Sequence, residues 1–321
     1  MAQPGQDEVV PPHLAAPGQL AIDEEPAARR PAPGAIPGRT RAERSRRVIA
    51  YAVLLGLAFL YFIPFFWTVA TSFKTLPESA KGFDLLPDHP TLAAYRDVLT
   101  RDDLPFLTFY RNSFILAGTI TVLEVFLASL AGYAFARLRF PGREVLFLLV
   151  LATLMIPDQL RLVPVYLILT DFPLTGWNLV QTFRGYVLIN LVTAANLFLM
   201  RQYFLTIPKD YEEAARLDGA GYFKTYWRVM LPLATPALAA VAILTFQGIW
   251  NDFFWALIVL GFGDPSKYTV QLGLSQFVLQ YGTLWPQLMA GATLAIAPVV
   301  LVYVFFQRYF VAGIAAAGVK G

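Results

Sequence analysis

Residues 206–234 read TIPKDYEEAARLDGAGYFKTYWRVMLPLA, a polar stretch between two long apolar segments at residues 183–205 and 235–260. Within it, Glu213-Ala214-Ala215 is followed after three residues by Gly219. After nine further residues come Val229 and then Leu231-Pro232. The pattern predicts apolar helices joined by a structured loop.

The composition indicates a membrane protein. Hydrophobic residues make up 57% of 321 residues, charged residues 15%, and the mean hydropathy is +0.54, which is too apolar for an ordinary water-soluble domain. The net charge of +3 does not suggest nucleic-acid binding. There is no Cys, and His13 and His89 both lie outside the apolar segments, so neither a catalytic site nor a metal site is expected.

The fold class predicted is all-α, with helices that cross a membrane. A helix needs about 20 largely apolar residues to cross the hydrocarbon core. Six segments meet that requirement: residues 48–70, 112–136, 145–169, 183–205, 235–260 and 285–310. Strand-like alternation is missing from the sequence, which argues against a membrane β-barrel.

Lys and Arg predict the orientation, because they concentrate on the cytoplasmic side. With both termini in the cytoplasm, the inside segments from Arg39 onward hold fifteen cations and the outside loops hold seven. We therefore expect a multi-pass protein of the plasma or inner membrane with the 206–234 loop inside.

The first 47 residues are rich in Pro, Ala and charge, and cannot bury enough apolar surface to fold alone. We expect a disordered cytoplasmic arm at residues 1–47 and a membrane domain at residues 48–321. The apolar run that follows the arm is too long for a secretory signal.

Two features predict how the helices pack. Ala128, Gly132 and Ala136 recur at a spacing of four, which lets another backbone approach closely. The alternative is that small residues are simply common in membrane helices. Pro157 and Pro164 should break or kink the third segment.

The 206–234 loop should contain two short helices. Pro208 suits a first helical position, and the acidic residues that follow suit the positive end of the helix dipole. Gly219 can end this helix in the left-handed conformation, and a second helix should run from about Tyr222 to Met230 until Pro232 stops it. Tyr211, Ala214 and Ala215 share one face, which could enter a groove of another protein. The alternative is an amphipathic helix that lies on the membrane surface.

This spacing resembles the Glu-Ala-Ala loop of ABC-importer permeases. Tyr133-Ala134-Phe135-Ala136-Arg137, Trp250-Asn251-Asp252-Phe253 and the tail from Gln307 are similar to further signatures of carbohydrate-type members. The resemblance covers about residue 48 to the end and is greatest to the smaller, MalG-like permease subunit of maltose-type sugar importers. It implies that the loop receives the ATPase stroke through Glu213, Ala214, Ala215, Arg216, Gly219, Leu231 and Pro232.

The resemblance also implies partners. They are a second homologous permease, an ATPase dimer, an extracytoplasmic solute-binding protein and the sugar. No Gly-x-x-x-x-Gly-Lys-Ser/Thr sequence is present, so ATP and Mg are expected on the ATPase partner, with no cofactor bound by this chain.

Polar residues within the apolar segments are candidates for the substrate path, because they usually face the interior of a bundle. Glu124 could pair with Arg161 or contact the solute, and Asp158 could pair with Arg161 three residues away. Aromatic and amide groups suit the ring faces and hydroxyls of sugars, although Trp often only anchors a helix at the interface. The candidates are Glu124, Asp158, Gln159, Arg161, Asn196, Trp250, Asn251, Asp252 and Trp255.

Three other functions fit the sequence less well. An ion-driven secondary transporter often has internal repeats with paired broken helices, and no second copy of the loop is present. An intramembrane enzyme lacks a His, Cys or convincing Ser arrangement. An ABC permease for a peptide or phosphonate would share the loop but not the Trp-Asn-Asp-Phe and tail patterns.

Overall fold

The computed structural model describes residues 41–82, 84–173, 175–279 and 282–318. These residues are mostly helical, and the described strands are the antiparallel pair β1 (Val278–Leu279) and β2 (Gly282–Thr283). The helical fold predicted from the sequence is confirmed. The chain divides into two compact units, residues 1–60 and 61–321, which are described separately.

The longest helices are α1 (Arg41–Ser72), α4 (Phe106–Arg137) and α15 (Trp285–Gly318). The shorter helices follow in chain order, with η2 and η4 as 3-10 turns and η3 as a π-helix: α2 (Leu76–Ser79), α3 (Ala93–Thr100), α5 (Arg143–Ala152), η2 (Thr153–Met155), α6 (Asp158–Thr170), α7 (Phe183–Ile189), α8 (Ala194–Thr206), α9 (Asp210–Leu217), α10 (Tyr222–Thr225), η3 (Tyr226–Met230), α11 (Leu231–Leu233), α12 (Thr235–Trp250), α13 (Phe254–Leu260), η4 (Pro265–Lys267) and α14 (Val270–Ser275).

Three described helices are each long and apolar enough to cross a membrane: Ser45–Ser72, Phe106–Arg137 and Trp285–Phe305. Three bent pairs also pass this test, with bends of 107° between Arg143–Met155 and Asp158–Thr170, 48° between Phe183–Ile189 and Ala194–Thr206, and 78° between Tyr222–Leu233 and Thr235–Trp250. If each pair is one span, the described residues hold up to six spans by length and composition.

The breaks have local causes. Pro157 directly precedes α6, so the predicted break of the third segment is found there, and Pro164 lies inside α6. The predicted fifth span, residues 235–260, is not one helix. Its first helix, α12, ends at Trp250, and a separate helix, α13, begins at Phe254.

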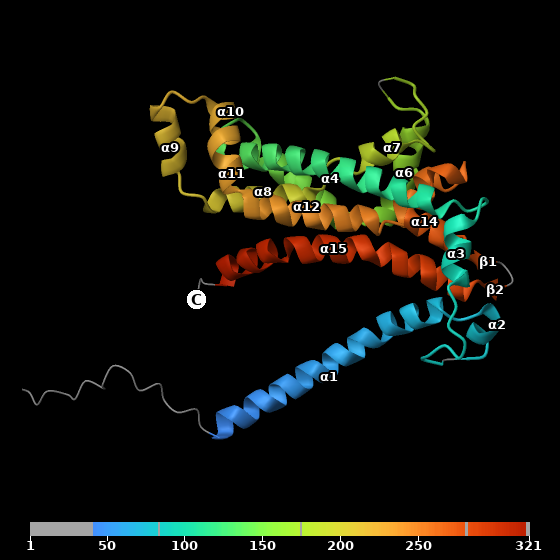
Figure 1. Ribbon diagram of the computed structural model, residues 1–321. Helices are drawn as coiled ribbons and strands as arrows, with labels where there is room; N and C mark the ends of the chain where they lie inside the picture. Colours follow the sequence, from blue (N-terminus) through green and yellow to red (C-terminus); the bar gives the residue numbers. More distant parts are fainter. Residues whose placement is uncertain (1–40, 83, 174, 280–281, 319–321) are drawn as a thin grey trace, which may run out of the picture. The chain divides into compact units, whose positions relative to one another are not determined.

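In the second unit, α4 packs lengthwise against α8 and α12, and α15 packs against α12 (Figure 1). A Cβ placed on Gly132 would come within 2.6 Å of the Met200 Cβ and 2.9 Å of the Arg201 backbone nitrogen. Ala128, on the same stripe, is fully buried. The predicted close approach through small residues is therefore confirmed, with α8 as the neighbour.

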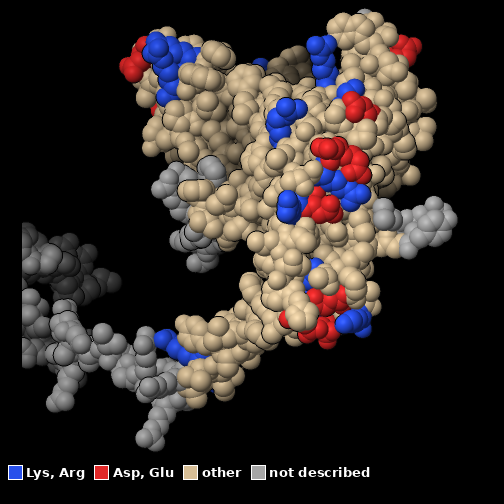
Figure 2. All heavy atoms as spheres, turned by 45° about the vertical axis from the view of Figure 1, so that its right-hand side comes forward, with Lys and Arg blue, Asp and Glu red and all other residues tan. Residues whose placement is uncertain are grey.

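Two hydrophobic clusters form the core of this unit. One surrounds Phe109, Trp250 and Phe277, near the start of α4. The other surrounds Tyr133, Met200 and Tyr226, near its end. Many large apolar side chains remain exposed, among them Met155 at 84%, and Lys, Arg, Asp and Glu gather in a few groups on the face drawn in Figure 2. Such an apolar surface suits lipid or another protein.

The first unit is described from Arg41, where α1 begins, so a helix starts within the last residues of the predicted 1–47 arm. Residues 1–40 lie outside the described residues. Large apolar side chains between Val48 and Leu60 are exposed, as a lipid-facing helix would have them.

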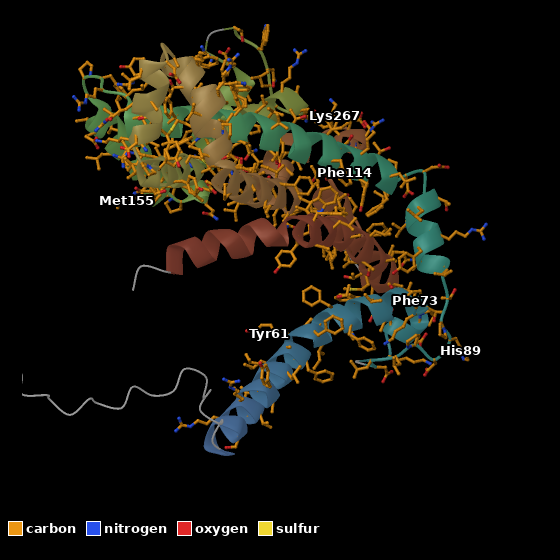
Figure 3. All side chains as sticks on the ribbon, turned by 60° about the vertical axis from the view of Figure 1, so that its left-hand side comes forward. Tyr61, Phe73, His89, Phe114, Met155 and Lys267 are labelled. Atoms are coloured by element: carbon orange, nitrogen blue, oxygen red, sulfur yellow. The ribbon has the colours of Figure 1, made fainter. Side chains whose placement is uncertain are left out.

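The segment between α1 and α4 has its own buried polar contacts, and Figure 3 shows Phe73 and His89 in it. Lys74 is buried and donates a hydrogen bond from Nζ to the Asp84 carbonyl. The buried Glu78 carboxylate accepts hydrogen bonds from the backbone amides of Asp88 and Thr75. The Asp88 amide in particular lowers the pKa of Glu78, because it stabilises the charged form.

Candidate functional site

The stretch at residues 206–234 folds into short helices at the left end of the bundle in Figure 1, where α9 lies beyond the ends of α4 and α8. Lys209 is the N-cap of α9, so the helix starts later than the predicted position of Pro208. The amides of Glu212 and Glu213 donate to the Lys209 carbonyl at 2.9 and 3.0 Å. Three carboxylates in the first turn suit the helix dipole, as expected.

Gly219 ends α9 in the left-handed conformation, with φ of +75°. Its amide donates to the Arg216 carbonyl at 2.9 Å, and the Ala220 amide donates to the Ala215 carbonyl at 2.9 Å. These two bonds form a Schellman motif, which satisfies carbonyls that the helix end leaves unpaired. The predicted helix end at Gly219 is confirmed.

The second helical piece continues past the predicted end at Met230. It passes from α10 through the π-helix η3 into α11, which includes Pro232. Pro232 has no N–H for the regular i to i−4 bond, and a π-turn is a common adjustment beside such an interruption.

The inner side of α9 is held by a charged contact that the motif analysis did not identify. The Arg137 guanidinium lies 3.9 Å from the Glu212 carboxylate, and both side chains are at least 90% buried. Arg137 also donates through Nη2 to the Phe204 carbonyl at 2.6 Å and to the Ile207 carbonyl. Arg137 thus connects the end of α4 to the end of α8 and to α9.

The outer side of the loop, by contrast, is exposed. Glu213, Ala214 and Arg216 are all exposed, while Ala215 is buried against its own chain. Of the two predicted groove-facing alanines, only Ala214 is therefore on the open surface. Leu231 is partly buried and Pro232 is exposed.

Aromatic and aliphatic side chains surround these exposed charges. Leu217 is 90% exposed, and the Arg216 guanidinium lies 4.9 Å above the centre of the Tyr222 ring. Phe223 and Trp227 are also exposed, and their rings stack at 6.4 Å. Exposed aromatics beside an Arg are typical of protein-binding surfaces. We call Glu213, Ala214, Arg216, Leu217, Tyr222, Phe223 and Trp227 the coupling surface, after the role that the sequence resemblance implies for this loop.

Glu124 lies inside the bundle rather than beside Arg161, so the predicted pair between them is wrong. Its carboxylate is 1% exposed and accepts hydrogen bonds from the Thr193 amide at 2.9 Å, the Thr193 hydroxyl at 2.6 Å and the Asn196 amide group at 2.8 Å. The Thr245 hydroxyl donates to the other oxygen at 2.9 Å. The structure brings Glu124 and Asn196 together and adds two threonines that sequence reasoning missed.

Asp158, Gln159 and Arg161 lie at the start of α6, directly after the sharp bend, and all are exposed. Asp158 and Arg161 form an ion pair on one helix face, which confirms the predicted i, i+3 pairing. This pair does not contact the Glu124 group.

The Trp250-Asn251-Asp252 signature is mainly structural at its first and third residues. Trp250 is 1% exposed, and its indole N–H donates to the Ala295 carbonyl of α15 at 3.0 Å. Asp252 accepts from the amides of Trp255 and Ala256 at the start of α13, and from the Tyr186 hydroxyl at 2.6 Å. Trp255 itself is only partly buried against the core.

An exposed stripe with two amide side chains, called the polar stripe below, runs along α12 to its C-cap Asn251 at helical spacing. Leu244, Gln247, Gly248 and Asn251 are all exposed. The side-chain amide of Gln271 in α14 donates to the side-chain oxygen Oδ1 of Asn251 at 3.4 Å. A groove of about 230 Å³ between α12 and α15 adjoins Gln247. Of this stripe, sequence reasoning selected only Asn251. The spacing of Gln247 and Asn251, four residues apart, was the signal available for Gln247.

Comparison with known proteins gives a consistent assignment. Residues 124–316 match the family described as binding-protein-dependent transport system inner membrane component. The arabinooligosaccharides transport system permease protein AraQ of Halalkalibacterium halodurans is 35% identical over 280 residues, which cover 85% of this chain and 98% of that protein. The diacetylchitobiose uptake system permease protein NgcG of Streptomyces coelicolor is 32% identical over 84% of this chain and 88% of that protein.

A solved structure agrees with this assignment over most of its length. A chain of a bacterial ABC transporter involved in the import of the acidic polysaccharide alginate superposes with a TM-score of 0.74 at 27% identity. The similarity covers 85% of this chain and 99% of that chain.

Proposed function

Since this chain belongs to the family of inner-membrane components of binding-protein-dependent transport systems, we propose that it is a permease subunit of an ATP-driven oligosaccharide importer. The coupling surface supports the ATP-driven part of this proposal. Its exposed apolar and charged residues lie on a loop whose inner side contacts the bundle through Glu212 and Arg137. The matches give no support to an ion-driven carrier or an intramembrane enzyme.

The proposed partners follow from surfaces that this chain leaves uncovered. The ATPase dimer would bind the coupling surface and would hold the ATP and Mg. A second permease would face α6, because the exposed Asp158–Arg161 pair is unfavourable against lipid. An external solute-binding protein would deliver the sugar to the outer side of the pair of permeases.

The proposed orientation places both termini and the coupling surface in the cytoplasm, with the segment between α1 and α4 outside. Because the chain has no Cys, single cysteines report cleanly on accessibility. In intact cells, an impermeant maleimide is expected to label Asp97→Cys and to leave Arg216→Cys unlabelled until the membrane is opened. Labelling of position 216 but not position 97 from outside would reverse the orientation.

The polar stripe on α12 is the sugar-facing surface in this proposal. Amide groups donate to and accept from sugar hydroxyls, and the exposed Gln247 and Asn251 present two of them on one helix face. The neighbouring Gly248 has no atom within 4 Å of a Cβ built on it, so the stripe opens onto free space.

Gln247→Leu and Asn251→Leu are each expected to raise the KM for sugar uptake by up to about tenfold, because a hydrogen bond to a neutral group contributes about 0.5–1.5 kcal/mol. Stimulation of ATP hydrolysis by saturating sugar-loaded binding protein should be retained. Leu244→Met, on the same face, changes no hydrogen-bonding group and serves as the control. Unchanged kinetics in both Leu variants would remove the stripe from the sugar path.

A further inference from the structure

The buried Glu124 group lies between the two helices that flank the coupling loop. We propose that Glu124 is a positioning residue that fastens α8 and α12 to α4, so that these helices follow the coupling loop as one body during transport. The inference rests on the proposed coupling function and adds to it the residue that connects the loop to the membrane helices.

The connectivity of the loop joins it to both helices. α8 ends at Thr206 and leads into α9, and α11 ends at Leu233 just before α12 begins at Thr235. A displacement of the coupling surface therefore acts on α8 and α12 together. Both helices pack against α4, and both bond to the same α4 carboxylate.

The bonds to α8 are made at its first turn. Thr193 is the N-cap of α8, and its hydroxyl accepts from the backbone N–H of Asn196 at 3.3 Å while it donates to Glu124. Asn190 is the C-cap of α7, and α7 and α8 meet at 48° across this break. Glu124 thus holds the beginning of α8 directly beside a bend in the chain, where the helix would otherwise be free to turn.

The other end of α8 is held by the same α4 helix. Arg137 donates to the Phe204 and Ile207 carbonyls, and Gly132 lets α8 approach closely between the two attachments. Residues 124 and 137 are thirteen positions apart, about 20 Å along a helix. Two attachments at this separation prevent α8 from sliding or rotating on α4.

The donor set matches a carboxylate. Four donated hydrogen bonds reach the two oxygens, and Asn196 also bonds to the Thr245 hydroxyl at 3.1 Å. An ionised carboxylate is acceptor-only, and the start of α8 adds the positive end of a helix dipole. Three of these bonds reach Oε1 and one reaches Oε2, so both oxygens of Glu124 are bonded within the bundle, as expected for a positioning role.

The test uses the complete transporter, with its partner permease, ATPases and binding protein, reconstituted in proteoliposomes. Glu124→Leu removes all the acceptors. It is expected to raise the number of ATP molecules hydrolysed per sugar imported by about tenfold, which lies in the usual range of coupling between sites. A residue that only stabilises the fold would lower ATP hydrolysis and uptake in proportion to the amount of assembled complex. An unchanged ratio in the assembled Glu124→Leu complex would overturn the inference.

Glu124→Gln is the matched variant, because its oxygen can still accept from Thr193 and Asn196 while its NH2 donates to Thr245. It is expected to keep the ratio within about twofold, well below the range of coupling effects. Hydrogen exchange by mass spectrometry should show faster exchange at the start of α8 in Glu124→Leu, and no change in Glu124→Gln. The role of the hydrogen bonds would be contradicted if Glu124→Gln raised the ratio as much as Glu124→Leu does. It would also be contradicted if hydrogen exchange at the start of α8 were unchanged in Glu124→Leu.

If the Glu124→Leu complex fails to assemble, the inference is tested by comparing two variants of Thr245. Thr245→Val removes the donor to Glu124 and should raise the ratio, whereas Thr245→Ser keeps the hydroxyl and should not. Equal ratios in these two variants would overturn the inference. Failure of the proposed coupling function would give a different result. In that case Glu213→Lys on the coupling surface would leave transport intact, independently of the results for the Glu124 variants.

Discussion

Glu213→Lys is expected to abolish sugar uptake, by about a hundredfold or more, while the protein still reaches the membrane and assembles. Glu213 is exposed in the first turn of α9, so its charge contributes little to the fold of this chain. In the proposed complex, reversing it places a cation against the partner group that it contacts, and like charges at an interface cost several kcal/mol. The measurement is uptake, together with ATP hydrolysis stimulated by loaded binding protein in the reconstituted complex.

The control for this experiment is Asp210→Lys, which makes the same charge change in the same helical turn outside the Glu-Ala-Ala pattern. It tests the effect of a cation at a helix N-terminus, which costs only about 0.3–1 kcal/mol. Sugar binding by the isolated binding protein should be unaffected in both cases. A helix that merely lay on an anionic membrane surface would tolerate the added Lys. Normal uptake in Glu213→Lys would therefore reject the coupling role of this loop.

Gly132→Leu is expected to prevent stable packing of α4 against α8 and to remove most of the assembled protein from the membrane. Even the first added atom would lie 2.6 Å from the Met200 Cβ and 2.9 Å from the Arg201 backbone nitrogen. Backbone atoms cannot move aside as the end of a flexible side chain can. Overpacking of this kind costs about 1–3 kcal/mol for a small insertion and more for a larger one.

The series Gly132→Ala, then Gly132→Leu should lower the midpoint of thermal unfolding stepwise, as followed by size-exclusion chromatography of the fluorescently tagged complex. Gly118 gives a matched control on the same helix, because a Cβ placed there has no atom within 4 Å. Gly118→Ala should leave the midpoint unchanged. Equal effects at both positions would show that the loss of glycine in the helix matters rather than the contact with α8.

The loop shows what can be read from residues alone. Its helix end at Gly219 depends on one left-handed residue, so it is local and was predictable. The predicted stop at Pro232 was wrong, because a π-helix lets the helical run continue into α11, which contains Pro232. Which of the loop's acidic residues is buried and which is exposed does not depend on local sequence. Glu212 faces Arg137, which is 75 positions earlier, and Glu213 faces outward, so the two neighbours differ only because of what packs behind α9.

The same distinction holds for the membrane helices. The membrane class, the approximate spans, the small-residue stripe through Gly132 and the break at Pro157 could be predicted from the residues, because each depends on apolar length, side-chain size or a proline within one segment. The bonds of Glu124 to Thr193 and Thr245, 69 and 121 positions away, rather than to Arg161, depend on how the helices pack and could not be predicted. A buried carboxylate must find donors wherever packing brings them, and three helices have to be in register before those donors exist.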